Sequence, residues 1–176
     1  MRVITGVFIA VSTSALMALP AAASTLPGAD ERQGTVFGTG VGPGFGVSVD
    51  GAISGDTRLG VALGMAMPFG VIPNYDLRLA HWIRTGTPRF DLTLVAGAFG
   101  MGATLPLGAE FGAGLAYELV PRLTGRLNIL IGTNFVSRVM YGPSSGFELG
   151  FAFTPRLEGT IGYNARGEVL GLRVRI

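Results

Sequence analysis

Residues that could do chemistry are few in this sequence, and they are widely spaced. The one histidine, His81, shares a face of its predicted strand with Leu79 and Ile83, as a packing or interface residue would. No serine lies two residues before or after it, so a serine–histidine pair along that strand is not formed. Glu110 and Glu118 would lie roughly 27 Å apart along one extended strand, too far for joint acid–base catalysis. We therefore predict that the protein is not an enzyme.

Other kinds of site need residue types or patterns that the sequence lacks. Cysteine is absent, which excludes disulfides, thiolate metal ligands and cysteine nucleophiles. The glycine-rich runs at residues 38–40 and 42–44 do not precede a predicted helix, so they are not nucleotide-binding fingerprints. All 13 basic residues are arginines, the net charge is only +2, and there is no basic run to bind nucleic acid. We predict no catalytic, cofactor-binding or metal-binding residue and no nucleic-acid partner.

The charged residues nonetheless follow a pattern. Within segments that alternate large apolar and small residues, nearly all charges lie on the face that carries glycine and alanine. Charges of both signs in a low-dielectric interior should pair, because an unpaired buried charge is costly. Such pairs would either fill and stiffen the interior or line a narrow polar passage that ions could cross. The predicted interior charges are Asp50, Arg58, Asp76, Arg78, Arg84, Asp91, Glu110, Glu118, Arg126, Glu148, Glu158, Arg173 and Arg175.

The elements that must position these charges are β-strands. Residues 109–132 show this most clearly, as a strand, a tight turn and a second strand. Phe111 and Leu115 share one face of the first strand, and Glu110 and Glu118 share the other with glycines, which is a period of two. A charge that faces hydrocarbon at mid-membrane costs about 2–4 kcal/mol, so a lipid-facing surface excludes it. The apolar face therefore suits lipid, and the small, charged face suits a narrow polar interior.

A recurring turn indicates how many strands there are. Four turns share a signature in which an arginine follows a threonine or proline and precedes a leucine or phenylalanine. They recur about every 33 residues, the length of two strands with their connections, as in an up-and-down meander. If the four turns join eight strands at one end, one further strand on each side makes ten, with both termini at that end. From residue 37 to residue 53 the large apolar residues stay at odd-numbered positions, that is, they keep one parity. Residues 42–44 could therefore form a kink within one strand, and eight strands is the alternative. The four signature turns are Asp56-Thr57-Arg58-Leu59, Thr87-Pro88-Arg89-Phe90, Val120-Pro121-Arg122-Leu123 and Thr154-Pro155-Arg156-Leu157.

The N-terminal region differs from the rest of the chain. Residues 1–23 have a positive Arg2, an apolar stretch and a small-residue end, Pro20-Ala21-Ala22-Ala23, and so predict a cleavable signal peptide; an uncleaved anchor is the alternative. Residues 24–33 are predicted to be a mobile periplasmic lead-in. Residues 34–176 are predicted to form the barrel, and the longest connection, residues 134–145, is expected to be a surface loop.

Two other fold classes compete with a membrane barrel. The mean hydropathy is +0.50 and only 14% of residues are charged, against roughly 25% in an average soluble domain. A soluble barrel or sandwich would expose a face made mostly of glycine and alanine, which is poor for solubility. A helical membrane protein is suggested by the uncharged residues 59–75 and 92–109, but both stretches contain proline and follow a period of two.

The region from about residue 34 to 176 resembles small bacterial outer-membrane β-barrel proteins of the porin-like, OmpA/OmpW-like class. The resemblance rests on the N-terminal signal pattern, on strand–turn units such as residues 117–123, and on the alternating terminal strand, residues 171–176. One departure is Ile176, since such barrels usually end in an aromatic residue that the assembly machinery recognises. The resemblance implies outer-membrane lipid, periplasmic chaperones and the barrel-assembly machinery as partners.

These observations lead to one expected function and two alternatives. We expect an all-β, up-and-down antiparallel transmembrane barrel of the bacterial outer membrane, with a structural role or a passive channel role for small solutes or ions. The first alternative is a soluble secreted or periplasmic barrel that binds a small apolar ligand. The second is an outer-membrane enzyme that modifies lipid.

Overall fold

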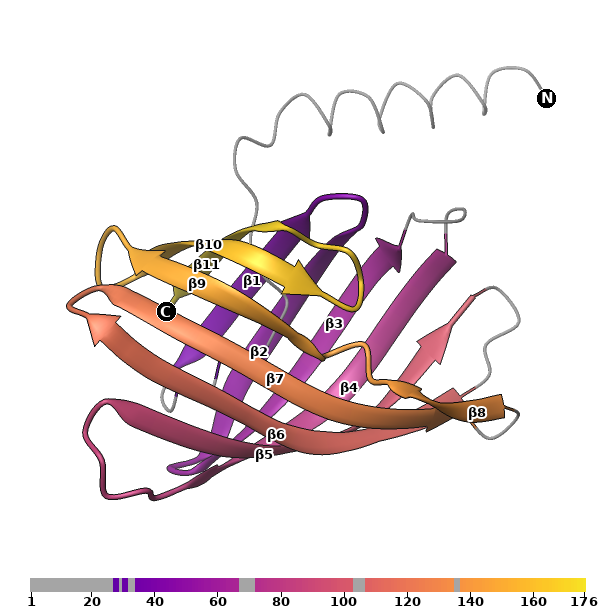
Figure 1. Ribbon diagram of the computed structural model, residues 1–176, viewed down its shortest axis with the longest axis horizontal. Helices are drawn as coiled ribbons and strands as arrows, with labels where there is room; N and C mark the ends of the chain where they lie inside the picture. Colours follow the sequence, from indigo (N-terminus) through magenta and orange to yellow (C-terminus); the bar gives the residue numbers. More distant parts are fainter. Residues whose placement is uncertain (1–26, 29, 32–33, 67–71, 103–106, 135–136) are drawn as a thin grey trace, which may run out of the picture.

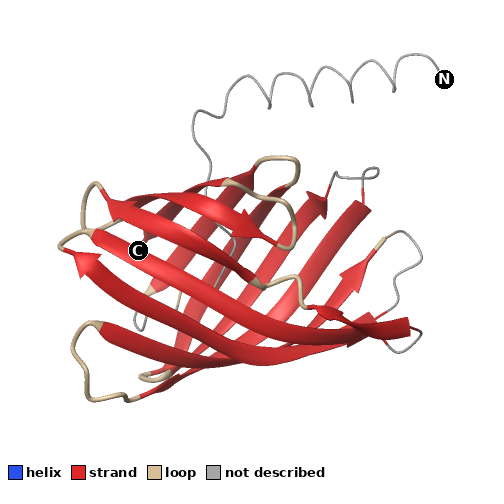
Figure 2. Cartoon of the chain, viewed as in Figure 1, coloured by secondary structure: helices blue, strands red, loops and turns tan. Residues whose placement is uncertain are grey.

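Eleven β-strands account for most of the chain that the structure describes. The computed structural model describes residues 27, 28, 30, 31, 34–66, 72–102, 107–134 and 137–176. Strands joined by turns and loops are drawn throughout this part (Figure 2). None of the described residues forms a helix long and apolar enough to cross a membrane. The strands are β1 (Thr35–Val41), β2 (Phe45–Ser54), β3 (Thr57–Ala66), β4 (Ile72–Ile83), β5 (Phe90–Met101), β6 (Leu107–Val120), β7 (Leu123–Asn134), β8 (Ser137–Tyr141), β9 (Gly146–Ala152), β10 (Leu157–Asn164) and β11 (Leu170–Arg175).

Ten of these strands close into one antiparallel barrel (Figure 1). Strands β1 to β7 pair in sequence order, β7 pairs with β9, and β9, β10 and β11 follow in order. Pairing of β11 with β1 closes the ring, from Val36 opposite Arg175 to Val41 opposite Leu170. Closure leaves no unpaired sheet edge in the ring. The predicted ten-stranded up-and-down barrel is confirmed, and the alternative of eight strands is wrong.

The first hairpin decides between ten and eight strands. Residues 42–44 reverse the chain, because Phe45 of β2 pairs with Val41 of β1 and the pairing continues to Gly51 opposite Thr35. Residues 37–53 can still keep one parity, since three residues separate Val41 from Phe45. The side chains of paired residues then point to the same face of the sheet. The kink that this parity suggested is therefore a turn.

The four signature turns lie at one end of the barrel, which we call the signature end. They join β2 to β3, β4 to β5, β6 to β7, and β9 to β10, and alternation of strand direction brings them together. The start of β1 and the C-terminus lie at the same end, where the Thr35 amide donates to the Ile176 carbonyl at 3.0 Å. In the β6–β7 turn Arg122 has a φ of 73°, in the left-handed region. The β1–β2 and β10–β11 turns lie together at the opposite end, where the Gly44 amide donates to the Gly167 carbonyl at 3.1 Å.

The connection predicted as a surface loop at residues 134–145 is partly a strand. Strand β8 pairs with the last residues of β7, and β9 pairs with the first ones along the same edge. Between them, residues 142–145 leave the sheet and are buried. The Ser145 hydroxyl replaces the lost backbone pairing, since it accepts from the Leu130 amide at 3.0 Å and donates to the Leu130 carbonyl at 2.9 Å. A serine side chain thus bridges a break in the barrel wall.

Burial alternates along the strands, with large apolar side chains outside and charged ones inside. In β2, for example, exposed Phe45, Val47 and Val49 alternate with buried neighbours that include Asp50. Few apolar side chains are buried among the described residues, and Ala80, Val95 and Leu130 form one cluster of them. The buried apolar residues are Val36, Ala62, Ala80, Trp82, Val95, Phe99, Ala116 and Leu130. Polar and charged groups fill most of the interior instead. The predicted signal peptide, residues 1–23, lies outside the described residues.

Candidate functional site

The charged lumen is the candidate site, and it contains most of the predicted interior charges. Asp91 and Arg175 are half-buried, whereas Arg84 and Glu118 are exposed at the signature end and do not reach into the lumen. The side chain of Arg84 is 82% exposed and pairs with Asp56 at 3.3 Å. The nine that are buried are Asp50, Arg58, Asp76, Arg78, Glu110, Arg126, Glu148, Glu158 and Arg173.

Arg126 is the centre of the charge network toward the signature end. Its Nη1 lies 3.1 Å from Glu148 Oε1 and 2.6 Å from Glu158 Oε1. Its Nε and Nη2 donate to the two Asp30 carboxylate oxygens at 2.6 and 2.7 Å, which is a bidentate arginine–carboxylate fork. Strand pairing of Arg126 with Glu148 places one of these partners directly across the sheet. The buried guanidinium therefore contacts three carboxylates.

Three further arginines lie around the same carboxylates. Arg173 contacts Glu148 at 2.6 Å and Glu31 at 3.1 Å. Arg175 contacts Glu158 at 3.1 Å and Asp30 at 3.5 Å. Arg58 donates to backbone carbonyls, including that of Asp50 at 2.7 Å and that of Glu31. We call Arg58, Arg126, Arg173 and Arg175 the arginine cluster.

Part of the lead-in lies inside the barrel, which differs from the predicted mobile segment at residues 24–33. Its described residues are Pro27, Gly28, Asp30 and Glu31. The Asn128 amide donates to the Pro27 carbonyl at 2.9 Å, so the segment also contacts the wall deeper in the lumen. Burial alone would raise the pKa of the Asp30 carboxyl, but the charge and hydrogen bonds of Arg126 outweigh burial and lower this pKa well below its ordinary value. Ion pairs with Arg126, Arg173 and Arg175 therefore hold the Asp30 and Glu31 carboxylates inside the lumen.

A second network lies toward the opposite end. Arg78 donates to the Asp50 carboxylate with Nε at 3.1 Å and Nη2 at 2.8 Å, and lies 3.6 Å from Asp76. Arg166, from the β10–β11 turn, is buried and pairs with Asp76. Its Nε donates to the Asn74 side-chain oxygen at 2.8 Å. Burial lowers the pKa of the Arg166 guanidinium, and nearby carboxylates oppose that shift.

Residues 142–145 close the lumen beside this network. The Ser144 amide donates to Glu110 at 3.3 Å, and its hydroxyl donates to Asp76 at 3.3 Å. Ser144 is completely buried. A Cβ on Gly142 would lie within 2.9 Å of Glu110 side-chain atoms, so only glycine allows this close approach. The wall itself therefore supplies the groups that fill this end.

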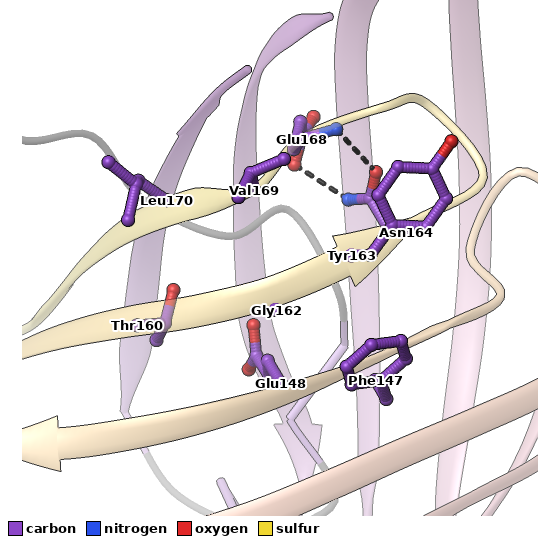
Figure 3. A pocket seen from close by; sticks show the side chains of 9 residues that line it. All are labelled: Phe147, Glu148, Thr160, Gly162, Tyr163, Asn164, Glu168, Val169 and Leu170. Carbon is purple, nitrogen blue, oxygen red and sulfur yellow. Dashed lines mark hydrogen bonds between the residues drawn. The ribbon is translucent and has the colours of Figure 1, made fainter. Parts of the chain in front are cut away.

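The β10–β11 turn holds Arg166 in place through a local hydrogen-bond pair. The Asn164 side chain donates to Glu168 Oε2 at 2.7 Å and accepts from the Glu168 amide at 3.1 Å (Figure 3). The cavity drawn there, between β9, β10 and the start of β11, has a volume of about 10 Å³. That is room for about one water molecule. The turn is therefore folded tightly against the wall.

Sequence reasoning missed the charges that lie outside strands. Asp30 and Glu31 were assigned to the lead-in, and Arg166 and Glu168 to a turn, because both segments carry the polar, small residues of solvent-exposed connections. Ser144 was missed for the same reason. A signal was present in Asp30 and Glu31, since two adjacent acids precede a wall that carries many arginines. No local periodicity links that pair to the residues it contacts.

Two features lie on the outer face. His81 Nδ1 is 2.9 Å from the Thr57 hydroxyl, a cross-strand neighbour that the search along one strand did not find. A groove of about 380 Å³ lies where β9 leaves β7, and its lining includes Ile129, Phe147 and Tyr163. Among the described residues, no group of three or more histidine, cysteine, aspartate or glutamate side chains is placed to hold a metal ion.

Comparison with known proteins adds no family to this geometry. No protein-family model matches the chain, and no curated protein matches its sequence.

Proposed function

We propose that the protein is an integral β-barrel of a bacterial outer membrane with a structural role. The observation that carries the proposal is the inverted burial of the barrel wall. Large apolar side chains such as Leu63, Phe111 and Phe147 are more than half exposed on the outer face, while arginines and carboxylates are buried inside. Water would disfavour an outer surface of this kind, and lipid would favour it.

The ion-paired lumen favours a structural role over an open channel. Arg126, Arg173 and Arg78 are buried and held by carboxylates, and the described lead-in residues occupy the space toward the signature end. Paired interior charges of this kind stiffen a barrel and leave little room for a solute to diffuse. Stiffness and closure are the properties that an envelope barrel with a structural role requires.

A passive ion channel is the second candidate. A vestibule of about 200 Å³ opens at the signature end and is lined by Asp30, Arg89, Asp91 and Glu118 among others. Its polar walls suit hydrated ions. Passage beyond the vestibule would require the lead-in to move, because Asp30 lies between the vestibule and Arg126.

The other two alternatives have less support. A soluble barrel that binds an apolar ligand needs an apolar interior, whereas this interior is charged. A lipid-modifying enzyme could use the Thr57–His81 pair on the outer face. Within the described part of the chain, the His81 side chain makes this one hydrogen bond, so no carboxylate there orients the ring as a general base.

The outer face provides a test that separates a membrane barrel from a soluble one. Ile129 lies in the middle of β7 and is 54% exposed, and Val120 borders the β6–β7 turn and is 53% exposed. In a membrane barrel, Ile129→Arg should destabilise the protein folded in lipid vesicles by about 2–4 kcal/mol. Val120→Arg should destabilise it by at most about 1 kcal/mol. Urea titration of vesicle-inserted protein measures both values.

The matched pair works because the two side chains are equally exposed to whatever surrounds the barrel. In water, arginine would be tolerated equally well at both positions. Equal stability of the two variants, with the mature chain found free in the periplasm on fractionation, would overturn the proposal. Outer-membrane fractionation and heat-modifiable migration of the folded protein in detergent gels are the expected results.

A further inference from the structure

The arginine cluster carries more positive charge than the barrel wall neutralises. The four arginines come from strands β3, β7 and β11. Among the described residues, the wall carboxylates that form ion pairs with them are Glu148 and Glu158. The other two carboxylates in the cluster, Asp30 and Glu31, come from the lead-in. Within ion-pair distance the four guanidinium groups thus have two carboxylates of the wall, and the other two belong to a segment that is not part of it. A third wall carboxylate, Asp50, also acts on Arg58, but it is bound by Arg78.

The contacts of the lead-in have the geometry of ligand recognition. Arg126 uses Nε and Nη2 to hold both Asp30 oxygens, at 2.6 and 2.7 Å. Arg175 reaches both lead-in carboxylates, at 3.5 Å from Asp30 and 3.7 Å from Glu31. A planar guanidinium binds carboxylate and phosphate oxygens in this forked manner. The same donors would fit any small oxyanion of similar shape.

The arginines themselves are held in position by the wall. Arg126 also pairs with Glu158 and Glu148, and Arg173 with Glu148, and both of these carboxylates belong to the wall. These wall contacts restrain the guanidinium groups, so the site is organised before a ligand arrives. A preorganised cluster with an excess of positive charge is a binding site for an anion.

We propose that the arginine cluster is an oxyanion-binding site of the lumen, which Asp30 and Glu31 occupy as an internal ligand. Its external ligand would be a small carboxylate- or phosphate-bearing solute that enters from the signature end and competes with the lead-in. The proposal concerns the lumen alone and holds whether or not the barrel lies in a membrane.

Inorganic phosphate is the probe that tests it. The full-length chain carrying both Asp30→Asn and Glu31→Gln, folded in detergent micelles at low ionic strength, is titrated by calorimetry beside the unsubstituted protein. We expect the apparent Kd for phosphate to fall at least tenfold, because the internal ligand has lost its charge while the arginines remain. Heat-modifiable migration confirms folding of each variant before titration.

Two further variants locate the effect. Asp56→Asn removes a carboxylate charge from the β2–β3 turn at the same end, where Asp56 pairs with exposed Arg84, and should bind phosphate no more tightly than the unsubstituted protein. Arg175→Gln, added to the double variant, removes a cluster arginine whose side chain is 33% exposed, and should reverse part of the gain. Equal phosphate affinity in the double variant, Asp56→Asn and the unsubstituted protein would overturn the proposal, as would a gain that Arg175→Gln leaves unchanged.

A labelling measurement decides the matter if the double variant does not fold. The chain has no cysteine, so Asp30→Cys places a single thiol in the cluster. A sulfonate-bearing thiol reagent should label it several-fold faster than a trimethylammonium reagent of similar size, and phosphate should slow the labelling. The same reagents applied to Asp56→Cys, in the β2–β3 turn at the same end, provide the control. A preference for the cationic reagent at Asp30→Cys would contradict an anion site.

Discussion

The two ends of the lumen are closed in different ways. At the signature end, Arg126 contacts Asp30, a residue 96 positions away in the sequence and outside the barrel wall. At the opposite end, residues 142–145 and the β10–β11 turn close the lumen, and the turn is held by an Asn164–Glu168 hydrogen bond that spans four residues. One closure depends on a separate segment finding its site, and the other is built from connections of the wall itself.

This difference has a physical consequence. Local turns cost little loop entropy to form, so the closure at the opposite end should be present whenever the wall is folded. The lead-in must give up chain entropy to stay in the lumen and receives ion pairs in return. The signature end is therefore the end that can open without unfolding the barrel. The following predictions test that asymmetry.

The largest effect is expected for Arg126→Ala. Removal of this guanidinium takes an ion pair from three carboxylates at once, so that Glu148 keeps only Arg173, and Glu158 and Asp30 have to share Arg175. Breaking a buried ion pair on one side typically costs about 3–5 kcal/mol. Urea unfolding in vesicles or micelles measures the loss, and Arg84→Ala, at an exposed ion pair, should stay within about 0.5 kcal/mol of the unsubstituted protein. Similar losses at both positions would remove Arg126 from the centre of the network.

At the opposite end, Arg166→Ala should cost less, about 2–3 kcal/mol. Asp76 loses the Arg166 contact but still lies 3.6 Å from Arg78, so the remaining buried charge is partly compensated. The β10–β11 turn should also exchange its amide hydrogens faster. Arg156→Ala, in the exposed β9–β10 turn, provides the control. A loss larger than that of Arg126→Ala would reverse the comparison between the two ends.

Ser145→Ala tests the break in the wall and should cost about 2 kcal/mol. The substitution leaves the Leu130 amide without a partner, whereas the Leu130 carbonyl still accepts from the Gly142 amide at 3.0 Å. An unsatisfied buried polar group costs about 1–3 kcal/mol. Ser54→Ala, at an exposed strand position, should change the stability by less than about 0.5 kcal/mol. Chemical denaturation of the two variants gives the comparison. No difference between them would mean that water replaces the hydroxyl.

The smallest effect is expected for Asp30→Asn, about 1 kcal/mol at neutral pH, since Arg126 keeps Glu148 and Glu158. The pKa of Asp30 is lowered in the folded state, so its ionised form stabilises that state. This contribution is complete above the unfolded pKa, roughly 3.9, and is lost as the pH falls toward the lowered pKa. The stability difference between the unsubstituted protein and Asp30→Asn, followed by denaturation from pH 7 to pH 2, should therefore be constant above roughly pH 5 and shrink below roughly pH 4. A difference that grows on acidification would contradict the ion pair.

The strand pattern could be predicted because it depends on neighbouring residues. Alternation of Glu110 with Phe111 places one inside and one outside, and a Pro121-Arg122 turn between two such strands joins them as a hairpin. Each step follows from strand geometry and local turn chemistry. Repetition of the turn then led to ten strands, which the structure confirms.

Prediction of the site was less complete. Arg84 and Glu118 continue the inward parity of their strands, but the strands end near them and their side chains reach solvent instead. Arg166 and Ser144 sit in connections whose sequence is typical of exposed turns, yet both are buried. Parity describes which face a residue takes, and it carries no information on where a strand or turn meets the end of the barrel.

By itself, then, the sequence determined the class of fold, the end at which the barrel begins and ends, and the face on which most charges lie, and it favoured ten strands over eight. These properties arise from a period of two and from turns of a few residues, which interact over short distances along the chain. Only the tertiary structure decided that Asp30 and Glu31 enter the lumen, that Arg166 turns inward and that Ser145 bridges a broken strand pairing. Those contacts join residues up to 145 positions apart, and closure of the ring is what brings them together.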